Sequence, residues 1–193
     1  MLSTHDKIYL QLEPTDASSV SLMSIRKRLL GIPDREAPNP IPFHLTILHI
    51  GAVDRLIRSI QPRSPFGEDE ILMRINTFSN RLAELAAQYQ KVDFSLEAIG
   101  LSLFGERKST LVILYSNFSE TLSAIHQDGY ILLNDLLKDC HILDPLECIK
   151  NDRNLKFCMT FNPHVTIAKK YNGSVGSIDT QPMNFRLMPV IYE

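Results

Sequence analysis

The feature that most constrains this chain is a four-residue pattern, His-x-Thr-Ile, that occurs twice. The first copy is residues 44–47 in PFHLTILHIG, and the second is residues 164–167 in NPHVTIAKKY, 120 positions later. Each copy lies in a short apolar run that is entered through a proline, Pro42 or Pro163. Such runs are typical of strands that begin after a loop. We therefore expect two core strands that carry the same pair of polar side chains.

The rest of the pattern predicts an α+β fold with antiparallel pairing rather than a regular βαβ array. Strands are expected at residues 7–12, 43–50, 92–103, 110–115, 164–169 and 183–192, with one more at 156–160. A stripe of apolar residues predicts a helix over 71–89, and a leucine-rich helix should follow a capping box at Asn117 and Glu120. Residues 32–42 hold four prolines and are expected to form a loop.

A first helix is expected between residues 16 and 30. Asp16 looks like its N-cap and Gly31 its stop signal. Its apolar side is expected to include Val20, Met23 and Leu30, with the basic run at residues 26–28 facing solvent.

Composition limits the classes of function. A length of 193 residues suits one domain over residues 1–193. A net charge of -2 argues against long duplex nucleic acid as a partner. A small nucleotide or an RNA end is still compatible. No apolar stretch approaches the roughly 20 residues that span a membrane, and the first residues lack the pattern of a secretory signal. Three cysteines at spacings that fit neither zinc nor a disulfide framework predict reduced thiols in the cytoplasm.

The repeated pattern predicts a specific arrangement of chemical groups. Residues i and i+2 of a strand share a face, so His44 projects beside Thr46, and His164 beside Thr166. Imidazole can take or give a proton near neutral pH, and a threonine hydroxyl can donate to a phosphate oxygen. If both pairs face one site, one histidine can act as base and the other as acid on the two sides of a phosphorus atom, with no metal required.

The two motifs, PFHLTIL and NPHVTIA, resemble those of the two-histidine (2H) phosphoesterase superfamily. Residues 98–115 are similar to that family's middle strand pair, and residues 184–192 to its terminal strand. The resemblance implies a bilobal, pseudo-two-fold fold, with antiparallel sheets flanked by helices around a central cleft. It also implies catalytic roles for His44 and His164 and phosphate-binding roles for Thr46 and Thr166, with no metal or other cofactor. The proline-rich approach to the first motif and residues 140–160 do not match the family pattern, which leaves the substrate open.

The expected reaction opens a 2′,3′-cyclic phosphate of a nucleotide or RNA end to a 2′-phosphate. Three alternatives stay open: a hydrolase of 2′,5′-linked oligoadenylate or cyclic oligonucleotides, a nucleotide-binding module without turnover, and a structural domain in which the motifs point apart. The sequence leaves open which histidine is the acid. We expect a monomer that does not bind membranes.

Other residues are assigned by position alone. Strand alternation puts Lys170 on the face of His164, where it could contact a phosphate, and Tyr171, Phe104 or Phe43 could stack on a base. The alternatives are a solvated strand end for the lysine and core packing for the aromatic residues. Five positions separate His49 from His44, so alternation puts it on the opposite face, in a structural or exposed position. The three other histidines are expected at the surface, and no motif predicts a metal site. They are His5, His126 and His141.

Overall fold

The computed structural model describes residues 2–31, 42–116, 119–178, 181–188 and 190–192. They form a mixture of helices with one curled antiparallel sheet, whose strand order is β3-β7-β1-β2-β6-β5-β4, with β8 also paired to β1. This mixture confirms the predicted helices and antiparallel strands. The strands are β1 (Lys7–Pro14), β2 (Leu45–Ala52), β3 (Phe94–Leu96), β4 (Ala98–Phe104), β5 (Thr110–Tyr115), β6 (His164–Ala168), β7 (Met183–Leu187) and β8 (Ile191–Tyr192).

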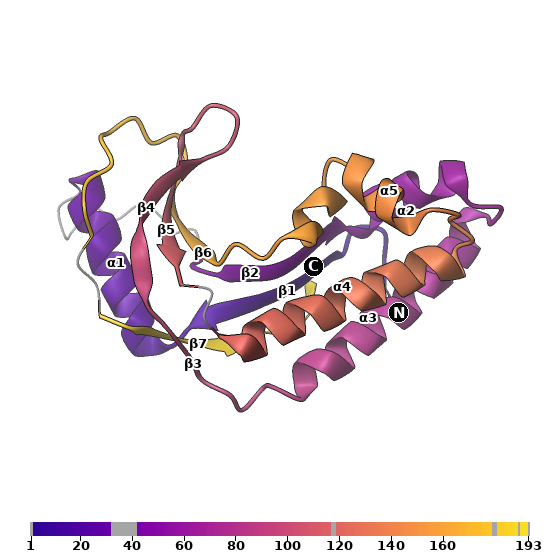
Figure 1. Ribbon diagram of the computed structural model, residues 1–193, viewed down its shortest axis with the longest axis horizontal. Coiled ribbons are helices and arrows are strands. Elements are labelled where there is room, and N and C mark those ends of the chain that lie inside the picture. The colour runs from indigo at the N-terminus through magenta and orange to yellow at the C-terminus, as the bar shows by residue number, and fades with distance from the viewer. Residues whose placement is uncertain (1, 32–41, 117–118, 179–180, 189, 193) are drawn as a thin grey trace.

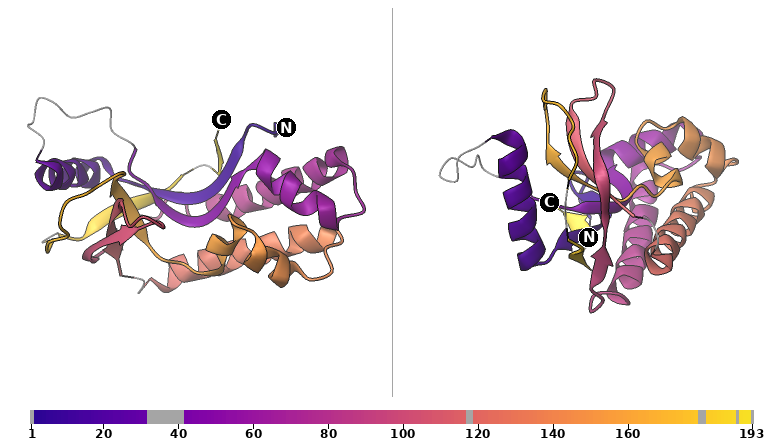
Figure 2. Two further views of the ribbon diagram at one scale, coloured as in Figure 1. Left: turned by 90° about the horizontal axis from the view of Figure 1, so that it is seen from above. Right: turned by 60° about the vertical axis from the view of Figure 1, so that its left-hand side comes forward.

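Helices lie at both ends of the curled sheet (Figures 1 and 2). At one end, α3 and α4 run side by side against β1 and β2, and at the other end α1 contacts β1, β6 and β7. Gly129 lets α4 approach the sheet closely, because a Cβ there would lie 3.1 Å from Leu48 Cδ2. The helices are α1 (Asp16–Leu30), α2 (Val53–Ile60), α3 (Glu68–Ala87), α4 (Glu120–Asp139) and α5 (Pro145–Asn151), with 3-10 turns η1 (Gln61–Arg63) and η2 (Leu155–Met159).

Most predicted strands are confirmed, but two of the predicted runs are divided. The predicted strand at 92–103 splits into β3, which pairs with β7, and β4, which pairs with β5. The run at 183–192 likewise becomes β7 and β8. β3 and β4 pair with different neighbours, whereas β7 and β8 both pair with β1. The residue pattern of one segment carries no information about such pairing.

Helix α1 has the predicted bounds but a different buried face. Gly31 ends it in the left-handed conformation, at φ 61°, as expected. Asp16 is the first helical residue rather than the cap, which is Thr15. Val20, expected on the apolar side, is 71% exposed, whereas Arg26, expected in solvent, is 7% exposed. The buried face is chosen by what α1 packs against, which is the backbone of β6 and β7 as well as apolar side chains.

The segment between α4 and β6 is helical, so the predicted strand at 156–160 is wrong. Asp144 caps α5 by accepting a hydrogen bond from the Glu147 amide at 2.9 Å, and η2 follows after a short turn. The sequence also missed α2, which directly follows β2. Ser119 caps α4, and the predicted cap Asn117 lies outside the described residues, as does most of the predicted loop at 32–42.

Candidate active site

The two motif strands are neighbours in the sheet. β2 and β6 pair antiparallel with Leu45 opposite Val165, the central residues of the two motifs. This register places His44 across from Thr166 and Thr46 across from His164. Leu45 and Val165 are both fully buried, whereas the four polar residues are each partly exposed. The two His-x-Thr motifs therefore lie side by side on one face of the sheet, with each histidine opposite the threonine of the other motif.

Both motif histidines are oriented by the same kind of contact. The Nδ1 atom of His44 lies 3.2 Å from the Pro42 carbonyl oxygen, and the Nδ1 atom of His164 lies 2.7 Å from the Asn162 carbonyl oxygen. A carbonyl only accepts hydrogen bonds, so each Nδ1 must carry the proton. In each neutral ring, Nε2 is then left with a free lone pair, which is the atom that can accept a proton from a substrate or water.

A pocket of about 360 Å³, here called the site pocket, opens over two of the four motif residues. Thr46 and His164 line it, and the ring of Phe104 lies 4.8 Å from the ring of His164, centroid to centroid. His44 and Thr166, the neighbouring cross-strand pair, do not line the pocket. The remaining lining residues are Ile47, His49, Phe157, Thr160 and Asn162.

Burial is the main influence on the charge of His44. Burial lowers the pKa of the ring, and repulsion from His164 and Lys169 lowers it further. The hydrogen bond to the Pro42 carbonyl raises the pKa but is a smaller effect than burial. Near neutral pH His44 is therefore held in the uncharged form, which can accept a proton.

A third histidine, His49, also lines the site pocket, and the prediction that it faces the opposite side is wrong. Two register shifts against β1 insert extra residues in β2, the first between Thr46 and Leu48. Ile47 and Leu48 are consequently both buried, and Thr46 and His49 emerge on one face. The adjacent apolar pair is the only sequence signal for this bulge. Burial, Arg55 and His44 lower the pKa of His49.

Two aromatic side chains line the site pocket. Phe104, from β4, was among the predicted contacts, whereas Phe157, from η2, was missed because a strand was expected there. Phe157 is 59% exposed and is stacked on His49, with ring centroids 6.4 Å apart.

The other predicted contacts lie elsewhere. Lys170 follows the end of β6 with φ at 56°, so strand alternation no longer applies to it. The Tyr171 hydroxyl donates to the Ser174 carbonyl. Phe43 is buried beneath Arg26, whose guanidinium carbon lies 3.9 Å from the ring centroid. None of the three lines the site pocket.

The remaining histidines divide into two exposed and one half-buried. His5 and His141 are exposed, as predicted. The surface position predicted for His126 is wrong, because its Nε2 donates to the Cys158 carbonyl at 2.9 Å and its ring stacks on Phe161. In the described parts of the chain, no three His, Cys, Asp or Glu side chains gather in a way that could hold a metal ion. No described helix is long and apolar enough to cross a membrane.

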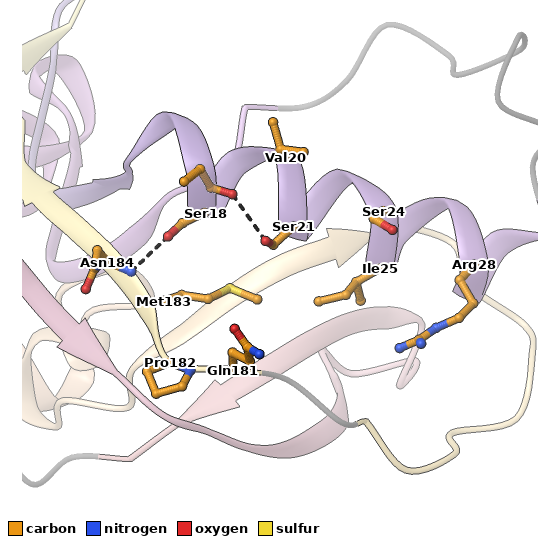
Figure 3. A pocket seen from close by; sticks show the side chains of 11 residues that line it. Ser18, Val20, Ser21, Ser24, Ile25, Arg28, Gln181, Pro182, Met183 and Asn184 are labelled. Carbon is orange, nitrogen blue, oxygen red and sulfur yellow. Dashed lines mark hydrogen bonds between the residues drawn. The ribbon is translucent and has the colours of Figure 1, made fainter.

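Another pocket, of about 480 Å³, lies between α1 and the start of β7 (Figure 3). Two of its serines make hydrogen bonds within the protein: Ser18 accepts from the Asn184 amide, and Ser21 donates to the Ala17 carbonyl. Among the described residues that line it, Arg28 is the only charged one. It has no group that can act as acid or base near neutral pH, so the site pocket is the better candidate.

A scan against models of known protein families, a search of curated proteins and a search of solved structures each found no match.

Proposed function

We propose that this protein is a metal-independent nucleotide phosphodiesterase that opens 2′,3′-cyclic phosphates. One observation carries the proposal: two His-x-Thr motifs meet on adjacent antiparallel strands, with both rings oriented by Nδ1–carbonyl contacts. The resemblance of these motifs to the 2H phosphoesterases points to the same reaction. The bilobal, pseudo-two-fold arrangement around a central cleft is part of this proposal.

In the proposed mechanism His44 is the base, because burial favours its uncharged form. Its Nε2 takes a proton from a water molecule as the water oxygen attacks phosphorus. The bond from phosphorus to the ribose 3′ oxygen breaks on the opposite side, and that oxygen takes a proton from Nε2 of protonated His164. The product is a 2′-phosphate, and a second proton exchange with solvent resets both rings. Because both protons are transferred by imidazole, the reaction needs no metal.

The threonines and aromatic residues would hold the substrate. The Thr46 and Thr166 hydroxyls would donate to the non-bridging phosphate oxygens, which carry the charge that builds up during attack. Phe104 and Phe157 line the site pocket and offer faces on which a base can stack. We expect Phe104→Ala to raise KM for a cyclic mononucleotide about tenfold with little change in kcat, because stacking contributes about 1–3 kcal/mol per base.

The test is hydrolysis of a substrate panel in EDTA: 2′,3′-cyclic mononucleotides, RNA with a cyclic phosphate end, 2′,5′-linked adenylates and cyclic dinucleotides. We expect His44→Ala and His164→Ala each to lower the rate on cyclic phosphates about 10²–10⁴-fold. His5→Ala, an exposed histidine, is the matched control and should leave it unchanged.

The panel also separates the alternatives. Consumption of only 2′,5′-linked or cyclic oligonucleotides would keep the chemistry and change the substrate. Tight nucleotide binding with no product would indicate a binding module instead. We further propose a cytoplasmic monomer, in which the three buried free cysteines stay reduced.

A further inference from the structure

A third pocket, of about 440 Å³ and here called the basic pocket, adjoins the site pocket. Phe157 lines both, and Phe104 of the site pocket is followed directly by Gly105 of the basic pocket. Its walls come from the β4–β5 turn and from the segment that enters η2, which face each other in Figure 1. Its lining residues are Gly105, Glu106, Arg107, Ser109, Arg153, Asn154, Lys156 and Phe157.

The basic pocket concentrates positive charge on a chain whose net charge is -2. Arg107, Arg153 and Lys156 line it together with a single acid, Glu106. All three cations are exposed, and none forms an ion pair with another residue in the described part of the chain. Two guanidinium groups in one pocket suit a phosphate, because each can donate two parallel hydrogen bonds to its oxygens.

Both walls of the basic pocket are held in place by local hydrogen bonds. In the β4–β5 turn, the Lys108 amide donates to the Gly105 carbonyl at 2.9 Å, and both residues have positive φ. In the other wall, one Asp152 oxygen accepts from the amides of Asn154 and Leu155 at 2.7 and 2.8 Å.

The second Asp152 oxygen accepts from the Ser59 hydroxyl. This carboxylate is therefore occupied in fixing the backbone beside Arg153 instead of pairing with its guanidinium. The backbone at Arg153 is thus fixed, and its exposed guanidinium can meet a ligand.

We infer that the basic pocket binds a second phosphate of the substrate, so that the preferred substrate is an oligonucleotide end. This inference rests on the proposed function, which uses the one phosphate of a cyclic mononucleotide at the histidines. Phe157 lies between the two pockets, where a base could stack while the chain of phosphates continues into the basic pocket. The second phosphate is either the phosphodiester of a neighbouring nucleotide or a terminal 5′-phosphate.

Three substrates in EDTA separate these sources: 2′,3′-cyclic AMP, its 5′-phosphorylated form, and the dinucleotide ApA with a 2′,3′-cyclic phosphate end. We expect the wild type to favour the dinucleotide over cyclic AMP at least tenfold in kcat/KM. The Arg107→Gln, Arg153→Gln double variant should lose that preference because its KM for the dinucleotide rises. Its kcat/KM for cyclic AMP should change less than twofold. An equal gain with the 5′-phosphorylated mononucleotide would support the second-phosphate site and show that a terminal 5′-phosphate fills it as well as a phosphodiester does.

The matched control removes the same charge elsewhere. Lys7 and Lys91 are exposed and line neither pocket, so the Lys7→Gln, Lys91→Gln variant should keep the wild-type preference. If the arginine variant also keeps it, or the wild type shows no preference for a second phosphate, the inference is overturned even though the proposed function stands.

A binding measurement distinguishes this failure from failure of the proposed function. Calorimetric titration with ApA bearing a 2′-phosphate needs no turnover. We expect the arginine variant to bind it at least tenfold more weakly than wild type and with a shallower dependence on salt, because a phosphate contact is lost. If no substrate is hydrolysed but this difference appears, the basic pocket stands and the hydrolase proposal fails. Equal binding by both proteins refutes the basic pocket.

Discussion

Replacing Arg26 by methionine should destabilise the protein by about 2 kcal/mol. This residue of α1 is 7% exposed, and its Nε donates to the Ile167 carbonyl of the second motif at 2.8 Å. Its guanidinium also covers the ring of Phe43, which precedes His44. Arg26 thus connects α1 to the backbone of one motif strand and to the entry of the other.

The magnitude follows from opposing contributions. A hydrogen bond from a charged donor contributes about 1.5–3 kcal/mol, and a cation–π contact about 0.5–2 kcal/mol. Methionine keeps much of the apolar stem but leaves the Ile167 carbonyl without this donor. Against this, the variant no longer has to bury a guanidinium, a cost visible in the pKa of Arg26, which burial lowers. The net loss is therefore smaller than the sum of the two contacts.

Urea unfolding of Arg26→Met and Arg28→Met would measure this effect. Arg28 lies on the same helix but is exposed, so its replacement should change the free energy of unfolding by less than about 0.5 kcal/mol. The Arg26 variant should lose about 2 kcal/mol, or about 4–8 °C in Tm for a chain of this size. If Arg26→Met is as stable as the wild type or more stable, the cost of burying the guanidinium outweighs its contacts, and the reasoning is wrong.

Two further predictions concern packing and pH. Gly129→Val should cost about 1–3 kcal/mol, since even a Cβ there lies 3.1 Å from Leu48, whereas Gly176→Val, in open space, should stay within about 0.5 kcal/mol in urea unfolding. Stability should also fall as pH drops below about 6.5. Burial lowers the pKa of His44, His49 and His126 in the folded protein, so the unfolded chain binds more protons than the folded one in this range. His126→Gln, which can still donate to the Cys158 carbonyl, should flatten that dependence; unchanged slopes in unfolding free energy against pH would contradict it.

Local patterns predicted the elements of this fold well, because each pattern depends on residues close together in the chain. Alternation located β1, a continuous apolar run located β5, and the stripe of apolar residues located α3. The buried face of α1 could not be predicted in this way. Arg26 is buried where β6 offers it a carbonyl group and Phe43 a ring, and neither contact can be read from the pattern of the helix itself.

The candidate site was predictable to the extent that strand alternation applied. It placed each motif threonine beside its histidine, and the structure adds that β2 and β6 are neighbours. The rule failed at His49 because of the bulge after Thr46, and at Lys170 because the strand had ended. Phe157 was missed because the 3-10 turn that carries it has too few residues to show a period.

The most direct test of the paired-histidine account compares two leaving groups with His44→Ala and His164→Ala. A 2′,3′-cyclic phosphate expels a ribose oxygen that needs a proton, whereas a 4-nitrophenyl phosphodiester expels a phenolate that needs none. We predict that His44→Ala lowers the rate of hydrolysis of both substrates about 10²–10⁴-fold in EDTA. His164→Ala should lower the rate on the cyclic phosphate as much, but the rate on the nitrophenyl ester less than tenfold. Equal losses on both substrates by both variants would contradict the division of roles. Wild-type rates in either variant, with its fold intact, would contradict the central claim that both histidines act on one phosphorus.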